Sequence, residues 1–147
     1  MFRMLGMGSK SSKTLPDDIV AQIILGEAAG EGPNGLEFVA DTMLNRAFAQ
    51  GKTLEEVATA PAQFSASARP DLQQFYLKQP QMLRDLAQAL VTERRDPAFT
   101  PKYHTSHYVT QDFYNNRHTL PKSHWVHRMD PVGTVGNHVA LRQRRQK

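Results

Sequence analysis

The most constraining feature of the chain is an apolar helical stripe that ends in a carboxylate. At 3.6 residues per turn, one helix face carries Ile19, Val20, Ile23, Ile24 and Glu27. This pattern predicts a core helix. An ionised glutamate in the stripe is costly to desolvate, so Glu27 should either find a partner or hold its proton near neutral pH.

Two interpretations of Glu27 follow. A protonated carboxyl group is what proton donation to a leaving-group oxygen requires, so Glu27 is a candidate catalytic acid. The helix is expected to end within residues 30–33, and its C-terminal dipole also disfavours negative charge. Alternatively, Glu27 lies at the edge of a core helix and its carboxyl group reaches water. The stripe alone leaves both interpretations open.

Composition limits the class of protein. A chain of 147 residues with 39% hydrophobic residues suits one globular domain. No run approaches the ~20 apolar residues of a membrane span. The absence of cysteine excludes disulfides, thiolate zinc sites and a cysteine nucleophile. We expect a flexible lead-in over 1–13, a single domain over 14–141 and a basic tail over 142–147.

Charge gives little evidence for a nucleic-acid partner. The net charge is +4, and Arg142, Arg144, Arg145 and Lys147 supply all of it. Such a tail is either a solvated end or a weak, salt-sensitive attraction to a polyanion. No basic patch interleaved with aromatic residues occurs elsewhere, so nucleic acid is not an expected partner. The first residues have no long apolar stretch or small-residue cleavage site, so we expect no signal peptide.

Periodicity predicts a helical front and an irregular back. Helices are expected over 15–29 after a Thr14 cap, over 34–50 before a Gly51 C-cap, and from the capping box at 53–56 to before Pro61. Further helices are expected over 71–76 and 80–96. Aromatic and β-branched residues predict short strands over 103–110 and 135–141. The predicted fold class is mainly α, of the α+β type, with a small β element in the C-terminal third.

Three short segments are candidate parts of a site. They are Asn45-Arg46, Gln63-Phe64-Ser65 and Gly136-Asn137-His138. Each also has a purely structural explanation, as helix-terminal residues, a turn around a core aromatic residue, and a bend before a strand.

The order of these segments is more specific than any one of them. Gly26-Glu27-Ala28-Ala29-Gly30-Glu31, Met43-Leu44-Asn45-Arg46, Pro61-Ala62-Gln63-Phe64-Ser65 and Gly136-Asn137-His138-Val139 resemble, in sequence, the spore-cortex-lytic and cell-wall-hydrolase family. The resemblance covers about residues 18–141. It implies a compact lysozyme-like, transglycosylase-like domain that cleaves peptidoglycan glycan strands, with Glu27 as the catalytic acid.

The chain departs from the family pattern in two places. Ser67-Ala68-Arg69-Pro70 stands where the family commonly has an Asp-Gly element, and Tyr103-His104-Thr105-Ser106 stands where it has an aromatic residue followed by His-Asn-Pro. Many members also carry a secretion signal and a wall-binding domain. A catalytic domain without either resembles phage or prophage proteins, and we therefore expect delivery to the wall by phage lysis or in a phage particle.

The available carboxylates favour a single-carboxylate reaction. A hydrolytic muramidase needs a second carboxylate, whereas a lytic transglycosylase uses the C6 hydroxyl of the muramic sugar as nucleophile. Glu31 is the nearest second candidate, but its flanking glycines predict an exposed position at the helix end. Asp41, on the polar side of its helix, and Asp71 are more remote candidates. We therefore expect 1,6-anhydromuramic ends, produced without a cofactor by a monomer.

The remaining candidates are substrate-binding residues. Gln63 and Ser65 offer hydrogen bonds to acetamido and hydroxyl groups, Phe64 lies between them, and Asn45 could orient the acid. Tyr103, Tyr108 and Trp125 could stack on sugars or pack in the core. His104 and His138 could line the cleft.

Two alternatives from other classes stay open. The pairs His104 and His107, and His124 and His127, suggest a zinc hydrolase, but no thiolate or acidic cluster completes a site, so we expect no metal. A non-catalytic wall-binding or virion structural module is the other alternative. It does not require an acid on an apolar stripe.

Overall fold

Helix α2 (Ile19–Glu27) is the central element of the structure, a computed structural model that describes residues 18–144. The expected lead-in, the Thr14 cap and the end of the basic tail lie outside these residues. Helix α2 begins four residues later than predicted because Asp18 is extended and accepts a hydrogen bond from the Val20 amide at 2.9 Å.

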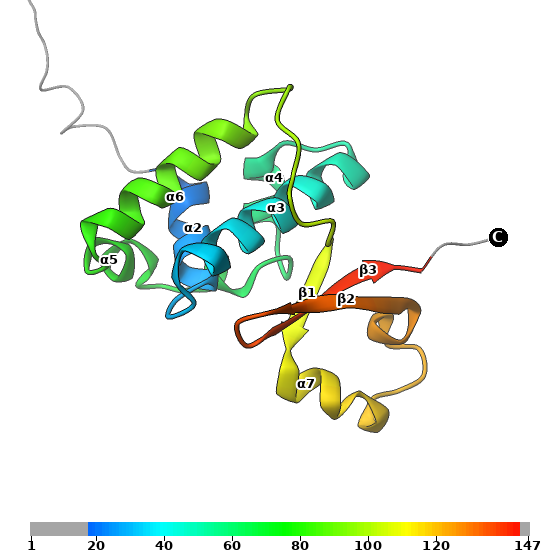
Figure 1. Ribbon diagram of the computed structural model, residues 1–147. Coiled ribbons are helices and arrows are strands. Elements are labelled where there is room, and N and C mark those ends of the chain that lie inside the picture. Colours follow the sequence, from blue (N-terminus) through cyan, green and yellow to red (C-terminus); the bar gives the residue numbers. More distant parts are fainter. Residues whose placement is uncertain (1–17, 145–147) are drawn as a thin grey trace, which may run out of the picture.

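Helix α2 is buried on nearly every side. All residues from Val20 to Leu25 are buried, and α2 contacts the helices that surround it. These are α3 (Gly32–Gln50), α4 (Leu54–Thr59), α5 (Leu72–Leu77), α6 (Gln81–Arg94) and the 3₁₀ helix η2 (Ser65–Ala68). Figure 1 shows α2 crossed by α6, with α3 beside it. A helix this apolar is stable only inside such a layer.

Local capping signals located several helix ends correctly. Thr53 and Glu56 form the predicted capping box at the start of α4. Gly51 adopts the left-handed conformation, with φ of 64°, and ends α3 as predicted. Helix α3 begins two residues earlier than predicted, with Pro33 in its first turn.

A three-stranded antiparallel sheet packs beneath the helices. Its order is β1 (His107–Thr110), β3 (His138–Gln143), β2 (Met129–Val135). The predicted strand over 103–110 is shorter than expected. The predicted strand over 135–141 was wrong at its start, because Gly136, with φ of 56°, turns the chain between β2 and β3. Strand β3 also continues to Gln143, two residues into the segment expected to be a tail.

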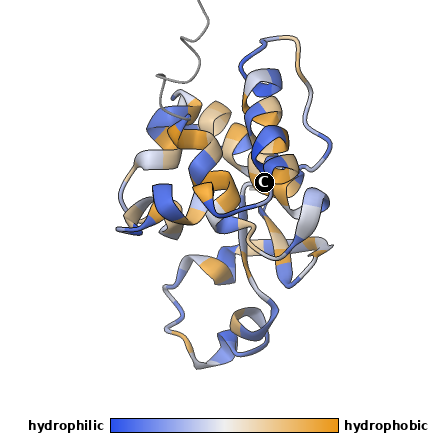
Figure 2. Ribbon diagram, turned by 90° about the vertical axis from the view of Figure 1, so that its left-hand side faces the viewer, coloured by the Kyte–Doolittle hydropathy of each residue, from blue (hydrophilic) through white to orange (hydrophobic). Residues whose placement is uncertain are grey.

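A small lobe connects β1 to β2 on the far side of the sheet. It contains α7 (Gln111–Asn115) and the 3₁₀ helices η3 (Arg117–Thr119) and η4 (Trp125–Arg128). Both ribbon views place it away from the helical body, and Figure 2 colours most of its residues as hydrophilic. A second core fixes it to the sheet, formed by Val126, Met129, Val139 and Leu141.

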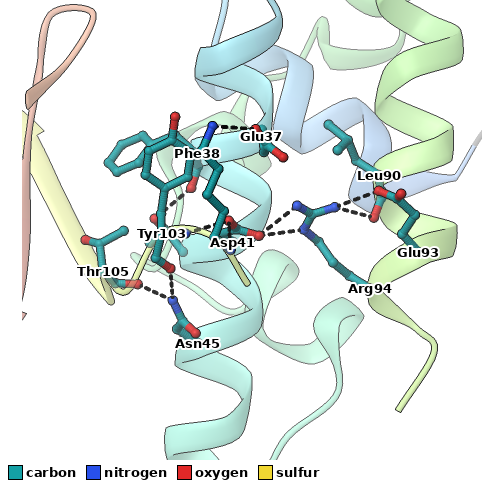
Figure 3. Close-up of polar contacts among 11 residues, drawn as sticks. Glu37, Phe38, Asp41, Asn45, Leu90, Glu93, Arg94, Tyr103 and Thr105 are labelled. Carbon is teal, nitrogen blue, oxygen red and sulfur yellow. Dashed lines mark hydrogen bonds and ion pairs between the residues drawn. The ribbon is translucent and has the colours of Figure 1, made fainter. Parts of the chain in front are cut away.

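A buried ion pair joins α3 to α6. Arg94 Nη2 lies 2.7 Å from Asp41 Oδ1, and both side chains are almost completely buried. The other carboxylate oxygen of Asp41 accepts hydrogen bonds from the Lys102 and Tyr103 amides at 3.0 Å each (Figure 3). The expectation that Asp41 lies on a polar helix face was therefore wrong. It is fully buried and bonded, and it fixes the segment that leads into β1.

Among residues 18–144, no helix is both long and apolar enough to cross a membrane.

Candidate active site

Glu27 is the last residue of α2, and three donors hold its carboxylate. The Ala66 amide donates to Oε2 at 2.7 Å, and the Ser65 hydroxyl donates to the same oxygen at 3.0 Å. The Tyr108 hydroxyl donates to Oε1. These bonds offset the unfavourable helix dipole and the partial desolvation. Of the two outcomes expected for Glu27, the structure shows the first, a carboxyl group with partners.

Gly26 allows η2 to approach Glu27 closely. A Cβ at position 26 would lie 2.9 Å from Cβ of Ala66, closer than side chains approach one another. With hydrogen there instead, the first turn of η2 rests on the end of α2 and directs the Ala66 amide at the carboxylate. The Gly26-Glu27 segment and the segment that contains Ser65 and Ala66, distant in sequence, therefore meet because position 26 has no side chain.

Arg46 fixes the other side of this loop. Its Nη1 donates to the Gln63 carbonyl at 3.0 Å and to Oε1 of Gln63 at 3.2 Å. Its Nε and Nη2 donate to the Ser106 carbonyl at 3.0 and 2.8 Å. The guanidinium also lies 4.5 Å from the centre of the buried Phe64 ring. One side chain thus joins α3, the loop before η2 and the start of β1.

The Glu27 cleft is an open depression between these elements, with a volume of about 690 Å³. Its lining residues are Gly26, Glu27, Arg46, Ala62, Gln63, Phe64, Ser65, Ala66, Arg69, Tyr108, Val109, Thr110 and His138. Ala62 has a positive φ of 63°, a conformation that costs free energy in a non-glycine residue and occurs often at functional loops. Glu27 is the one carboxylate in this lining of described residues.

Tyr108 is a strongly perturbed group of the cleft. Burial raises the pKa of its phenol well above the ordinary value, and the charge and hydrogen bond of Glu27 act in the same direction. The phenol therefore stays protonated and remains a donor to Glu27 over the whole working pH range. Burial also lowers the pKa of the Arg46 guanidinium, and electrostatic interactions with Tyr108 and Glu27 partly oppose this shift.

Glu31 supports the β2–β3 turn. Its Oε1 accepts a hydrogen bond from the Asn137 amide at 3.2 Å and lies 3.4 Å from Nδ1 of His138. A Cβ on Gly136 would lie 1.9 Å from the same oxygen, so the turn needs glycine for this contact as well as for its φ. The expected exposed position was wrong, because the Glu31 side chain is only 15% exposed.

The structure places these other predicted site residues in three different positions. His138 lines the cleft and packs against Tyr108, with ring centroids 4.8 Å apart. Asn45 does not line the cleft. It donates to the Tyr103 and Thr105 carbonyls at 2.8 Å each, as Figure 3 shows. Tyr103 and His104 line a different pocket, between β2 and the segment before β1.

Three contacts of the site were not predicted from sequence. Tyr108 was considered as a stacking aromatic residue, not as a donor to Glu27. The Ala66 amide carries no side-chain signal at all. Arg69 lines the cleft from a segment noted only as a departure from the family pattern. For Tyr108, the strand pattern around it was the one signal that could have directed attention to this face.

No three histidine and acidic side chains within residues 18–144 come together in a way that could hold a metal ion. The paired histidine spacing in the sequence therefore does not assemble a ligand set in the described part of the chain. Asp71, the remote carboxylate candidate, pairs with Arg69 on the surface.

Solved structures share this architecture. The catalytic domain of the Bacillus cereus SleB protein is 21% identical, with 84% of this chain and 87% of that chain covered and a TM-score of 0.58. The catalytic domain of the germination-specific lytic transglycosylase SleB from Bacillus anthracis is 23% identical, with 84% and 90% covered and the same TM-score of 0.58. This likeness confirms the predicted lysozyme-like α+β fold.

The two SleB domains thus have the fold that the cortex-lytic resemblance of the sequence predicted. No protein-family model matches the chain, and no curated protein matches it.

Proposed function

We propose that the chain cleaves the β-1,4 bond between N-acetylmuramic acid and N-acetylglucosamine in peptidoglycan, as a lytic transglycosylase with Glu27 as the single acid and base. The observation that carries this proposal is a carboxylate, oriented by three donors, that is the one acidic group among the described residues of an open cleft. The shared fold with a lytic transglycosylase domain and the ordered motifs support the substrate class.

The arrangement suits both halves of the reaction. The Glu27 carboxyl group donates its proton to the glycosidic oxygen as the bond from that oxygen to C1 of the muramic sugar breaks. The resulting carboxylate takes the proton of the C6 hydroxyl while that oxygen bonds to C1 and closes the anhydro ring. Glu27 ends protonated, as it began. A carboxylate has about four lone-pair sites, so three bound donors leave room for this exchange.

The alternative of a hydrolytic muramidase needs a second carboxylate to activate water. Glu31 is the nearest candidate, but its oxygen is engaged by the Asn137 amide and it does not line the cleft. This placement favours the single-carboxylate reaction.

Replacing Glu27 by glutamine tests the proposal. Glu27→Gln keeps an oxygen that can accept from the Ala66 amide, so the variant should fold, with a melting temperature close to that of the wild type. Release of soluble fragments from purified peptidoglycan should fall by at least about 10²–10⁴-fold, because the acid is lost. Mass spectrometry of the wild-type fragments should show anhydro ends, lighter by one water than reducing ends.

Glu31→Gln is the matched control. It makes the same chemical change four residues along the chain, and its amide oxygen can still accept from Asn137. The expected loss of activity is less than about tenfold. Reducing ends together with an inactive Glu31→Gln variant would establish the hydrolytic alternative. Tight binding to insoluble peptidoglycan without any soluble product would establish a binding module.

A further inference from the structure

A side pocket of about 260 Å³ opens from the Glu27 cleft toward the lobe. Its lining residues are Arg46, Ala62, Gln63, His107, Tyr108 and Trp125. All except His107 and Trp125 also line the cleft, so the pocket adjoins the cleft. A polymer lying in the cleft can therefore reach it.

Trp125 forms the aromatic end of this pocket. Its ring lies 5.1 Å from His107 and 5.3 Å from His124, and His124 in turn lies 5.8 Å from Phe113. Trp125 begins η4 and packs partly against the second core beneath the sheet. These contacts restrict the indole, so little conformational entropy is lost when a ligand stacks on it.

Two N–H donors of the pocket have no partner among the described residues, whereas Arg46 and Tyr108 donate to Gln63 and Glu27. Oε1 of Gln63 accepts from Arg46, so the amide nitrogen is the group of this side chain that can donate to a ligand. Within residues 18–144, neither this nitrogen nor the Trp125 indole nitrogen has a hydrogen-bond partner, and none of the six lining residues is acidic. Burial, together with the charge of Arg46, lowers the pKa of His107 to about 4, so its imidazole is neutral near pH 7.

An apolar ring face beside N–H donors is complementary to a pyranose. One face of such a sugar presents C–H groups, and its edge presents hydroxyl and acetamido oxygens. We propose that the side pocket is a sugar-binding subsite, in which Trp125 stacks on an N-acetylated sugar of the glycan strand and the Gln63 amide donates to its oxygens. The subsite rests on the proposed function, since the strand in the cleft delivers the sugar.

Trp125 is the single tryptophan of the chain, so its fluorescence reports directly on the pocket. The full-length Glu27→Gln variant is titrated with a soluble β-1,4-linked N-acetylglucosamine hexamer. We expect a saturable change in emission, with a midpoint equal to that found by calorimetry. Unchanged emission at millimolar hexamer overturns the subsite, whether or not calorimetry detects binding elsewhere.

Substitution gives a second readout. In the Glu27→Gln background, Trp125→Ala should weaken hexamer binding about tenfold. In the active chain it should raise KM for glycan strands by a similar factor while kcat changes less than about threefold. Trp125→Phe should restore most of the affinity, because an aromatic face remains. Phe48→Ala, at a 66% exposed aromatic residue of α3 that lines neither the cleft nor the side pocket, is the matched control.

The two proposals fail in distinguishable ways. If the wild type cleaves peptidoglycan and Trp125→Ala has the same KM, the subsite is refuted and the proposed function stands. If the wild type releases no fragments but the hexamer changes Trp125 emission, the proposed function is refuted and the subsite stands.

Discussion

At the scale of single residues, the site depends on how one carboxylate is oriented. Glu27 ends a helix whose dipole disfavours its charge, and the Tyr108 hydroxyl, the Ser65 hydroxyl and the Ala66 amide offset that cost. Two of these donors come from η2 and one from β1. The direction of the carboxyl group is therefore set by both the helical body and the sheet.

Removing the Tyr108 hydroxyl should disturb this orientation. In Tyr108→Phe, Oε1 of Glu27 loses its donor, and we expect kcat on peptidoglycan to fall about 10–100-fold with little change in KM, because the acid is no longer held in one position. Steady-state kinetics on soluble glycan strands measure the effect.

Tyr103→Phe is the matched control for this prediction. It removes the same atom from an aromatic residue that lines a different pocket, and its kcat should remain at the wild-type level. Equal losses in the two variants would contradict a specific role for the Tyr108 hydroxyl.

At the scale of elements, helix α3 connects the other parts of the molecule. Arg46 donates hydrogen bonds to the Gln63 loop and to Ser106, just before β1. Asp41 accepts hydrogen bonds from Arg94 of α6. Because Asp41 and Arg46 both belong to α3, a shift of this helix would move both connections. The geometry of the cleft is therefore linked to the packing of α3 on α6.

Breaking the Asp41–Arg94 pair should destabilise the fold strongly. Arg94→Leu leaves a buried carboxylate with only the Lys102 and Tyr103 amides as donors, and we expect a loss of about 3–5 kcal/mol in the free energy of unfolding. Urea denaturation followed by circular dichroism measures it.

An exposed ion pair provides the comparison. Arg144 and Asp130 are 59% and 50% exposed, and Arg144→Leu should cost less than about 1 kcal/mol. A similar cost for both substitutions would mean that burial does not determine the contribution of the Asp41–Arg94 pair.

At the scale of the whole molecule, the sheet separates two hydrophobic cores. The larger core lies among the helices, and the smaller one lies between the sheet and the lobe. The Glu27 cleft and its side pocket follow the boundary between the helical body and the sheet. Any loss of packing across this boundary should therefore affect the site.

His107 at this boundary should make folding stability depend on pH. Burial and Arg46 lower its pKa from 6.5 to about 4, so the unfolded chain binds a proton that the folded chain does not bind between these values. The contribution is fully present above pH 6.5 and is lost as the pH falls toward 4. Because His107 is only half-buried, we expect a loss of about 1–2 kcal/mol over this range.

Urea denaturation at pH 7 and pH 4.5 measures this dependence. His107→Gln should reduce the difference between the two pH values, whereas the same substitution at the exposed His118 should leave the difference at its wild-type size. An unchanged difference in His107→Gln would show that other groups account for the acid sensitivity.

The sequence by itself determined those parts of the fold that have local causes. The capping box at Thr53, the left-handed Gly51 and the apolar run of α2 depend on neighbouring residues, and each was predicted at or near its observed place. The motif order likewise singled out Glu27 and the Gln63 loop. These signals act over a few residues, where spacing and residue type are sufficient.

The tertiary structure decided the rest, because the causes act between distant segments. Strand β2 was missed since Pro131 and Gly133 weaken its pattern, and both are tolerated only because β2 is an edge strand with a bulge. The donors to Glu27, the burial of Asp41 and the support that Glu31 gives to the β2–β3 turn all join residues far apart in the chain. The periodicity of a sequence cannot identify such partners, because they come together only when the helices pack on the sheet.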